Sequence, residues 1–150
     1  MALTTVTSGM GGGVVKQIVY TSNATEAETT GTSYANTAHT VTITPAASAN
    51  KILVGVSFAA GVELDSGTEA SVLFKLRNTT DSADLNEVTL QINGASGALR
   101  SYASQTLIGV DTGRTGATVY YLQVKSANSS TTAKVNEGAD LGFMWAIELE

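Results

Sequence analysis

The chain has 150 residues, of which 43% are hydrophobic and only 14% are charged, and its formal net charge is -5. This composition excludes a disordered polar chain, and the length indicates one domain with its own core. The chain contains no cysteine, which excludes disulfides, thiolate nucleophiles and zinc–thiolate sites. The acidic balance disfavours a nucleic-acid partner, because phosphate binding needs clustered Lys and Arg.

Residues 1–13 predict a short N-terminal arm. The three consecutive glycines at 11–13 would form a flexible joint before the first strand. Within this arm we expect the apolar residues Leu3, Val6 and Met10 to contact a partner. The segment has neither the basic nor the apolar region of a signal peptide, so we expect synthesis in the cytoplasm without signal-directed export. No apolar run is long enough to predict a membrane span.

From residue 14 onward, apolar residues recur with a period of two, which is typical of β-strands. In the segment 38–44, Val41 and Ile43 are expected to point inward while threonines point outward. In the last segment, apolar residues of odd number from 141 to 149 share one parity. Gly, Asn, Ser and Pro between the segments predict turns, including 45–50 and 93–97. We therefore expect strands at 14–22, 38–44, 51–58, 71–78, 86–92, 99–110, 116–126 and 139–150.

No stretch shows a capped helical stripe with a period of 3.6 residues. Strands without helices predict an all-β fold, and the number and spacing of these strands favour an antiparallel β-sandwich of the jelly-roll type. We expect residues 14–150 to form this single domain behind the arm. Without an internal repeat, no second domain is predicted.

The stretch LIGVDTGRTG at 107–116 allows two interpretations. Two apolar residues before Asp-Thr-Gly are typical of the catalytic strand of a retroviral-type aspartic protease, in which paired aspartates share a proton. That family has a small residue where Arg114 stands here. Asp-Thr-Gly is also a good loop between two strands, because Asp caps its own backbone and Gly accepts a positive φ. We favour a surface loop at 111–116 that exposes Asp111 and Arg114.

His39 is the only histidine, so a multi-histidine metal site is excluded. No G-x-S-x-G stretch accompanies it, so a hydrolase triad is not expected. His39 has the parity of Val41 and Ile43, and we expect it at a strand end or in a subunit contact. If three copies met near an axis, its titration would make assembly sensitive to pH.

Acidic residues gather at 61–70, where Glu63, Asp65 and Glu69 follow one another closely. Calcium prefers such oxygen ligands, but the spacing of an EF-hand is absent. We therefore expect a solvated surface loop containing Glu63 and Asp65, and leave open a structural ion beside them. The Gly-rich start lacks the Lys-Ser/Thr of a phosphate-binding loop. No cofactor and no enzymatic activity are predicted.

The stretch HTVTITPAASANKILVGVSF at 39–58 resembles a module of tailed-bacteriophage structural proteins that is common near the C-terminus of tail fibres. That module has an alternating strand, then Ile-Thr-Pro, a short Ser/Ala loop, and Lys-Ile-Leu-Val before the next strand. The final AIELE at 146–150 and the opening MALTTVTSGM are also similar to such proteins. The matching residues are Val41, Ile43, Thr44, Pro45, Ala46, Ser48, Asn50, Lys51, Ile52, Leu53 and Val54.

The resemblance implies a non-enzymatic virion protein that acts as a homotrimer. The resemblance favours a short tail-fibre or receptor-binding protein that is anchored by residues 1–13. We expect its loops 61–70, 78–86 and 111–116 to face a host surface glycan or protein. The alternative is a capsid decoration protein, in which the arm is the working part. Neither hypothesis includes binding to nucleic acid or insertion into a membrane. A retroviral-type aspartic protease is a remote third hypothesis.

Overall fold

A computed structural model describes residues 6–7 and 15–150, and these form an all-β protein in which every strand pairing is antiparallel. One short 3-10 helix, η1, interrupts the strands. The elements in chain order are β1 (Val6–Thr7), β2 (Val15–Asn23), β3 (Ala27–Thr29), β4 (Ala35–Ile43), β5 (Lys51–Asn78), β6 (Ala83–Thr112), β7 (Thr118–Ser126), β8 (Thr131–Val135), η1 (Glu137–Ala139) and β9 (Gly142–Leu149).

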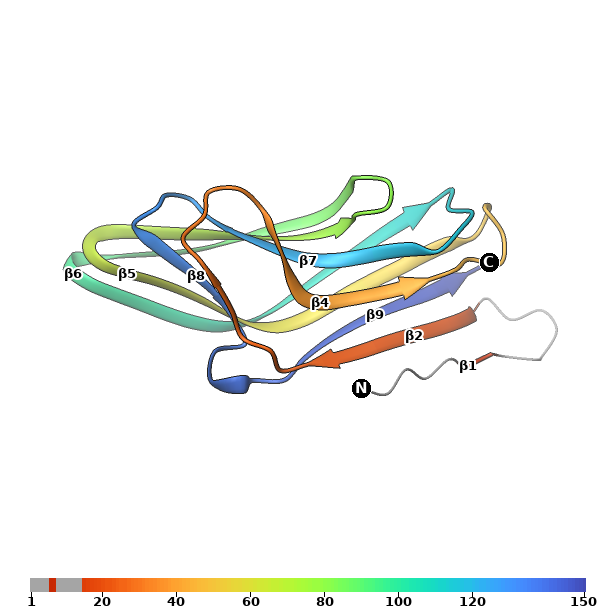
Figure 1. Cartoon of the computed structure of the whole chain (residues 1–150), viewed down its shortest axis with the longest axis horizontal. Coiled ribbons are helices and arrows are strands. Elements are labelled where there is room, and N and C mark those ends of the chain that lie inside the picture. Colours follow the sequence, from red (N-terminus) through yellow and green to blue (C-terminus); the bar gives the residue numbers. More distant parts are fainter. Residues whose placement is uncertain (1–5, 8–14) are drawn as a thin grey trace.

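The fold is organised by one very long hairpin. β5 has 28 residues and β6 has 30, and the two pair from Lys51↔Thr112 at one end to Asn78↔Ala83 at the turn. Halfway along, both strands bend back on themselves, which Figure 1 shows at the far end of the molecule from the C-terminus. Gly67 and Gly97 face each other in this bend, each with φ 149°. Because side chains disfavour that conformation, a glycine pair permits the bend without ending either strand.

The bend lays the two halves of β5 against each other as two layers. The first half pairs with β9 and β8, and the second half pairs with β7. Phe58 from the first half meets Phe74 from the second, with ring centroids 5.0 Å apart. Even-numbered residues of both halves fill the interior, as the period of two requires. The buried core residues of β5 are Ile52, Val54, Val56, Phe58, Ala60, Val62, Leu64, Ala70, Val72, Phe74 and Leu76.

Hydrogen bonds close the two sides of this arrangement. On one side β2 lies beside β4, where Thr21 Oγ1 donates to the Thr40 carbonyl at 2.7 Å. On the other side the two halves of β6 meet, and there Asn86 Nδ2 donates a hydrogen bond to the Ile108 carbonyl at 2.8 Å. The predicted all-β class is confirmed, and the two layers are compatible with a β-sandwich.

Several predicted strand boundaries were wrong, because pairs of predicted strands are continuous in the structure. The strands expected at 51–58 and 71–78 are two halves of β5, and those expected at 86–92 and 99–110 are two halves of β6. The glycines and polar residues between them were interpreted as turns, but they serve the bend. The short strands β3 and β8 were not predicted at all. Both are rich in threonine and charged residues, and they form because β8 pairs with β5 and β3 pairs with β8.

Candidate functional site

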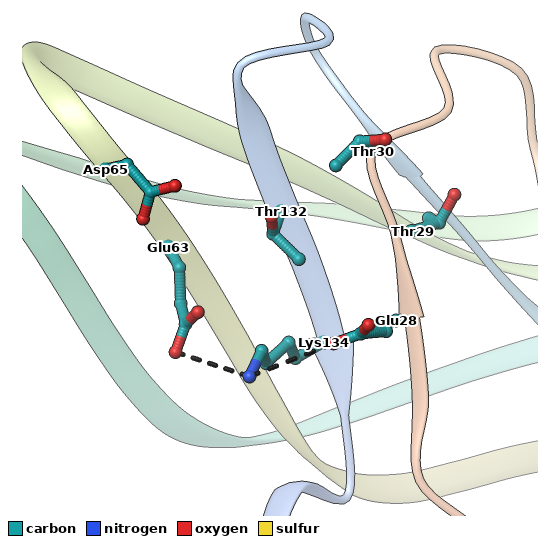
Figure 2. A pocket seen from close by; sticks show the side chains of 7 residues that line it. All are labelled: Glu28, Thr29, Thr30, Glu63, Asp65, Thr132 and Lys134. Carbon is teal, nitrogen blue, oxygen red and sulfur yellow. Dashed lines mark ion pairs between the residues drawn. The ribbon is translucent and has the colours of Figure 1, made fainter.

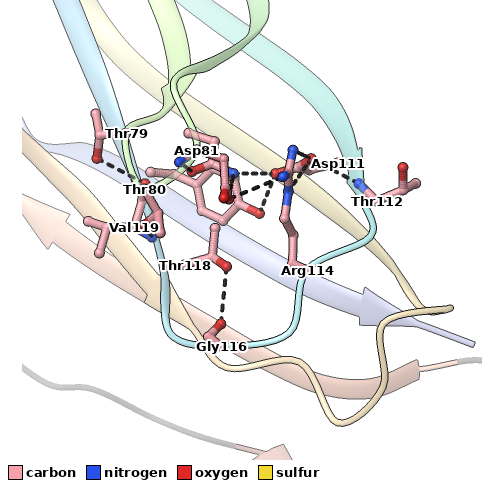
Figure 3. Close-up of polar contacts among 11 residues, drawn as sticks. Thr79, Thr80, Asp81, Asp111, Thr112, Arg114, Gly116, Thr118 and Val119 are labelled. Carbon is pink, nitrogen blue, oxygen red and sulfur yellow. Dashed lines mark hydrogen bonds and ion pairs between the residues drawn. The ribbon is translucent and has the colours of Figure 1, made fainter.

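Asp111 lies at the centre of a buried polar cluster at the end of the long hairpin (Figure 3). Its Oδ1 accepts hydrogen bonds from Arg114 Nε at 2.8 Å and Nη2 at 2.6 Å, and from the Thr112 amide at 2.9 Å. Its Oδ2 accepts from Asn78 Nδ2 at 2.7 Å and from the Tyr120 hydroxyl at 3.0 Å. The carboxylate therefore joins the ends of β5, β6 and β7.

The surface-loop prediction was wrong for Asp111. β6 extends to Thr112, and Asp111 is only 4% exposed. Burial alone would raise the pKa of Asp111, but the hydrogen bonds from Arg114, Asn78 and Tyr120 outweigh it and hold the pKa below its usual value. A carboxylate held as an anion by an arginine differs from the proton-sharing pair of an aspartic protease.

A small hollow of about 200 Å³ opens beside this cluster. It lies between the turn 79–82 and the loop 113–117, which Arg114 connects through an ion pair to Asp81 at 3.1 Å. Arg114 is half-buried in that loop, where it was predicted to lie. Its guanidinium thus contacts both Asp81 and Asp111, and it fixes the positions of the two connections. The side chains around the opening are Thr80, Asp81, Arg114, Thr115, Ala117 and Thr118.

A wider, open hollow of about 450 Å³ lies over β3, β8 and the first half of β5 (Figure 2). Lys134 extends into it from β8 and forms ion pairs with Glu137 at 2.8 Å and Glu63 at 3.4 Å. The Tyr102 hydroxyl donates to Glu63. Threonine hydroxyls and carboxylates dominate the lining, which consists of Glu28, Thr29, Thr30, Glu63, Asp65, Thr132 and Lys134.

Glu63 and Asp65 lie in strand β5, so the predicted loop at 61–70 was wrong. Glu69 lies beyond the bend and accepts a hydrogen bond from Gln91 at 2.9 Å. Across residues 6–7 and 15–150, no group of three or more His, Asp or Glu side chains could hold a metal ion. The polar hollow offers hydrogen-bond acceptors to a ligand rather than a cation cage.

His39 is buried in the middle of β4, at 1% exposure, so neither a strand end nor a subunit contact describes it. Its Nε2 lies 2.7 Å from Asn136 Nδ2, and Nδ1 has no hydrogen-bond partner in the described part of the chain. A Cβ atom at Gly142 would lie 2.3 Å from the His39 ring, so the imidazole fills the space above that glycine. Burial lowers the pKa of His39, which keeps the ring neutral near pH 7.

The buried carboxylate of Glu148 was not predicted. Glu148 is 0% exposed, and Oε1 accepts from the Ala46 amide at 2.7 Å and from Asn50 Nδ2 at 2.6 Å. Oε2 accepts from Gln17 Nε2 at 2.8 Å. Burial alone would raise the pKa of Glu148, but these donors lower it. The sequence pattern pointed the other way, because the large apolar residues of this segment have odd numbers. The structure instead buries the even-numbered Met144, Ala146 and Glu148.

The arm residues Leu3 and Met10 lie outside the described residues. Val6 belongs to β1, whose backbone pairs with β2 in the register Val6↔Ile18. Within the described ranges, no helix is long and apolar enough to span a membrane.

No protein-family model and no curated protein sequence matches the chain. Among solved structures, a chain in the structure of infectious bursal disease virus, Gx strain, is similar at 13% identity with a TM-score of 0.31. The match covers 89% of this chain and 37% of that one, so this chain spans little more than a third of its length. At this level of similarity the match is no argument for a shared function.

Proposed function

We propose that the chain is a non-enzymatic structural protein on the surface of a tailed-phage particle, acting as a homotrimer in a short tail-fibre or receptor-binding role. The proposal starts from the resemblance of residues 39–58 and 146–150 to a phage fibre module. One observation carries it further. Glu148 from the final strand holds the backbone of Ala46 and the side chain of Asn50, so the two resembling segments form one structural unit.

The recognition surface of the proposed protein consists of the turn 79–82 and the loop 113–117. These connections lie at one end of the molecule and are held together by the Asp81–Arg114 ion pair. Exposed threonines and a glycine-containing loop offer hydrogen-bond groups to a host surface glycan or protein. Residues 1–13 are the proposed anchor, and the proposed partners include neither nucleic acid nor the interior of a membrane.

Capsid decoration is the second candidate function, and the pairing of β1 favours it. Val6 and Thr7 add to the edge of the sheet beside β2 through backbone pairing. Strand addition of this kind is one way in which an extended segment joins the sheet of a neighbouring molecule. In that role the arm would connect neighbouring copies on the head of the particle.

Location and mass together test the proposal. Light scattering of the purified chain gives the copy number, and antibody labelling of intact particles gives the location. A trimer at the tail tip supports the fibre function, whereas a trimer spread over the head supports decoration. A monomer that is absent from particles contradicts both.

Adsorption then tests the recognition surface. Excess purified protein should slow phage adsorption to host cells, and Thr115→Arg in the loop 113–117 should abolish this competition. Thr42→Arg, at an exposed position of β4, is the matched control and should compete like the unchanged protein. Equal competition by both variants would contradict a role for this loop.

A further inference from the structure

One outer face of the molecule is apolar where a solvated sheet is usually polar. Leu53 on β5 pairs with Ile147 on β9 and with Val110 on β6, and directly paired residues of an antiparallel sheet project to the same side. In the next row, Trp145 and Ile108 flank Gly55, and Phe143 follows one row further. We call Leu53, Ile108, Val110, Phe143, Trp145 and Ile147 the apolar face.

These side chains are open to solvent in the single chain. Val110 is 57% exposed, Ile108 47% and Phe143 45%, while Leu53, Trp145 and Ile147 are half-buried. β9 and β5 lie side by side beneath them (Figure 1). Soluble monomers seldom expose a contiguous apolar patch of this kind, so the patch marks an interaction surface.

Trp145 lies flat within the apolar face. A Cβ atom at Gly55 would lie 2.1 Å from Cζ2 of Trp145, so the indole ring lies across the backbone of that glycine instead of projecting outward. A level sheet face suits packing against another flat surface, as sheets do at a spacing of about 10 Å. The two hollows described above are lined by other residues.

The outer face of the other layer is built differently. There Lys75 forms ion pairs with Asp84 at 2.8 Å and with Glu87 at 3.5 Å. Tyr34 lies against Lys75 and Lys125, whose ammonium groups are 4.0 and 4.6 Å from its ring centroid. Charged side chains of this kind are readily solvated. The apolar character is therefore specific to the face formed by β9 and the first half of β5, and is not a general property of the molecular surface.

The distribution of charged side chains favours a second copy of this chain as the partner of the apolar face. Its three rows continue onto β2 through Ile18, Tyr20 and Ser22, and they contain no Asp, Glu, Lys, Arg or His side chain. The charges that flank them on this side of the sheet include Lys51 at one end and Lys134 of β8, with its acidic partners, at the other. Copies of a chain with net charge -5 repel one another, and a charge-free face lets them meet without placing like charges opposite each other.

We propose that the apolar face is the contact between copies of this chain, with three faces turned toward a common axis. The number of copies rests on the proposed function, whereas the choice of face rests on the geometry above. Assembly would bury the exposed parts of Ile108, Val110 and Phe143, and would bring the sole tryptophan, Trp145, into an apolar environment.

Light scattering over a range of concentrations tests this contact in the full chain. The unchanged protein should have the mass of three copies. Ile108→Lys and Val110→Lys should each raise the concentration for half-dissociation by at least about tenfold, because a lysine would be buried without a partner. Thr89→Lys, at an exposed position of the same strand on the other layer, is the matched control and should remain a trimer. Circular dichroism verifies that each variant is folded.

The fluorescence of Trp145 gives a second readout that needs no variant. Its emission should shift to shorter wavelength as the concentration of the unchanged protein rises through assembly. Trimers that persist in both folded lysine variants, or emission that does not change with assembly, would overturn the choice of face and leave the proposed trimer intact. A monomer at every concentration would overturn the contact and the proposed copy number together, while particle labelling would still decide the virion location.

Discussion

Asn50 Nδ2 donates a hydrogen bond to Glu148 Oε1 at 2.6 Å, although 98 residues separate the two side chains in sequence. The same oxygen accepts from the Ala46 amide, so one carboxylate holds the turn that follows Pro45. No Lys or Arg side chain bonds to it in the described part of the chain, and its charge is stabilised by amide donors alone. Loss of this group would leave buried donors without an acceptor.

Glu148→Ala should lower the free energy of unfolding by about 2–4 kcal/mol, since each buried group left unpaired costs about 1–3 kcal/mol. Urea denaturation monitored by circular dichroism measures this loss. Glu150→Ala is the control, because that carboxylate is 60% exposed and forms its ion pair with Lys16 at the surface. This change should alter stability by less than about 1 kcal/mol. Equal effects of the two changes would contradict the anchoring role of Glu148.

Asp111→Asn should lower the free energy of unfolding by about 2–3 kcal/mol. The half-buried Arg114 loses one of its two anionic partners and keeps Asp81, and an amide replaces a carboxylate that accepts five hydrogen bonds. The folded-state pKa of Asp111 is depressed, so its contribution is present above the unfolded pKa of 3.8 and is lost as the pH falls below that value. Chemical denaturation at pH 7 and pH 3 measures both effects. Asp65→Asn, at an exposed position, should stay within about 0.5 kcal/mol.

Burial of His39 predicts a second pH effect at higher pH. Its folded-state pKa lies below the unfolded value of 6.5, so the unfolded chain binds this proton first. Stability should therefore be unaffected above that value and should fall as the pH drops below it, by at most about 1.4 kcal/mol per pH unit. His39→Gln should flatten this slope in thermal melts between pH 7 and about pH 5, and Thr42→Ala should preserve it. An unchanged slope in His39→Gln would contradict burial of a neutral imidazole.

Gly55→Ala should displace the Trp145 indole, because the added Cβ would lie 2.1 Å from Cζ2. We expect a loss of about 1–3 kcal/mol in the free energy of unfolding and an altered tryptophan emission. The double variant Gly55→Ala/Trp145→Ala isolates the contact. Gly55→Ala should cost at least about 0.5 kcal/mol less when it is introduced into the Trp145→Ala variant than when it is introduced into the unchanged protein. Strict additivity would mean that the ring does not lie over this glycine.

Gly97→Ala tests the bend of the long hairpin. No atom of the described residues lies within 4 Å of the added Cβ, but φ is 149°. The cost should therefore come from the backbone conformation and amount to about 1–3 kcal/mol. Gly116 provides the comparison, since its Cβ space is equally open and its φ is ordinary. Gly116→Ala should be neutral or slightly stabilising, because alanine restricts the unfolded chain. Thermal melting of the two variants at equal concentration compares them directly.

The sequence predicted the strand class well, because the period of two in segments such as 38–44 and 51–58 is set directly by the buried face. It predicted continuity poorly. The residues around Gly67 and Gly97 have the composition of turns, and only the pairing partner shows that they bend a continuous strand. The burial of Glu148 could not be predicted for a different reason. A carboxylate in a sequence is expected to be exposed, and only the structure shows that Gln17 and Asn50 lie beside it as hydrogen-bond donors.

The shared β5–β6 hairpin also sets how the chain can reach its native state. Starting at the turn 79–82, each new pair of residues closes only a short additional loop, so the hairpin can zip outward at low entropic cost. As it passes the facing glycines it folds over, and both layers acquire their central strands together. The later strands β7, β8 and β9 then add to a template that already exists. A nucleus containing the turn would be visible as slowed refolding when Asp81 or Asn78 is changed, while unfolding rates respond less.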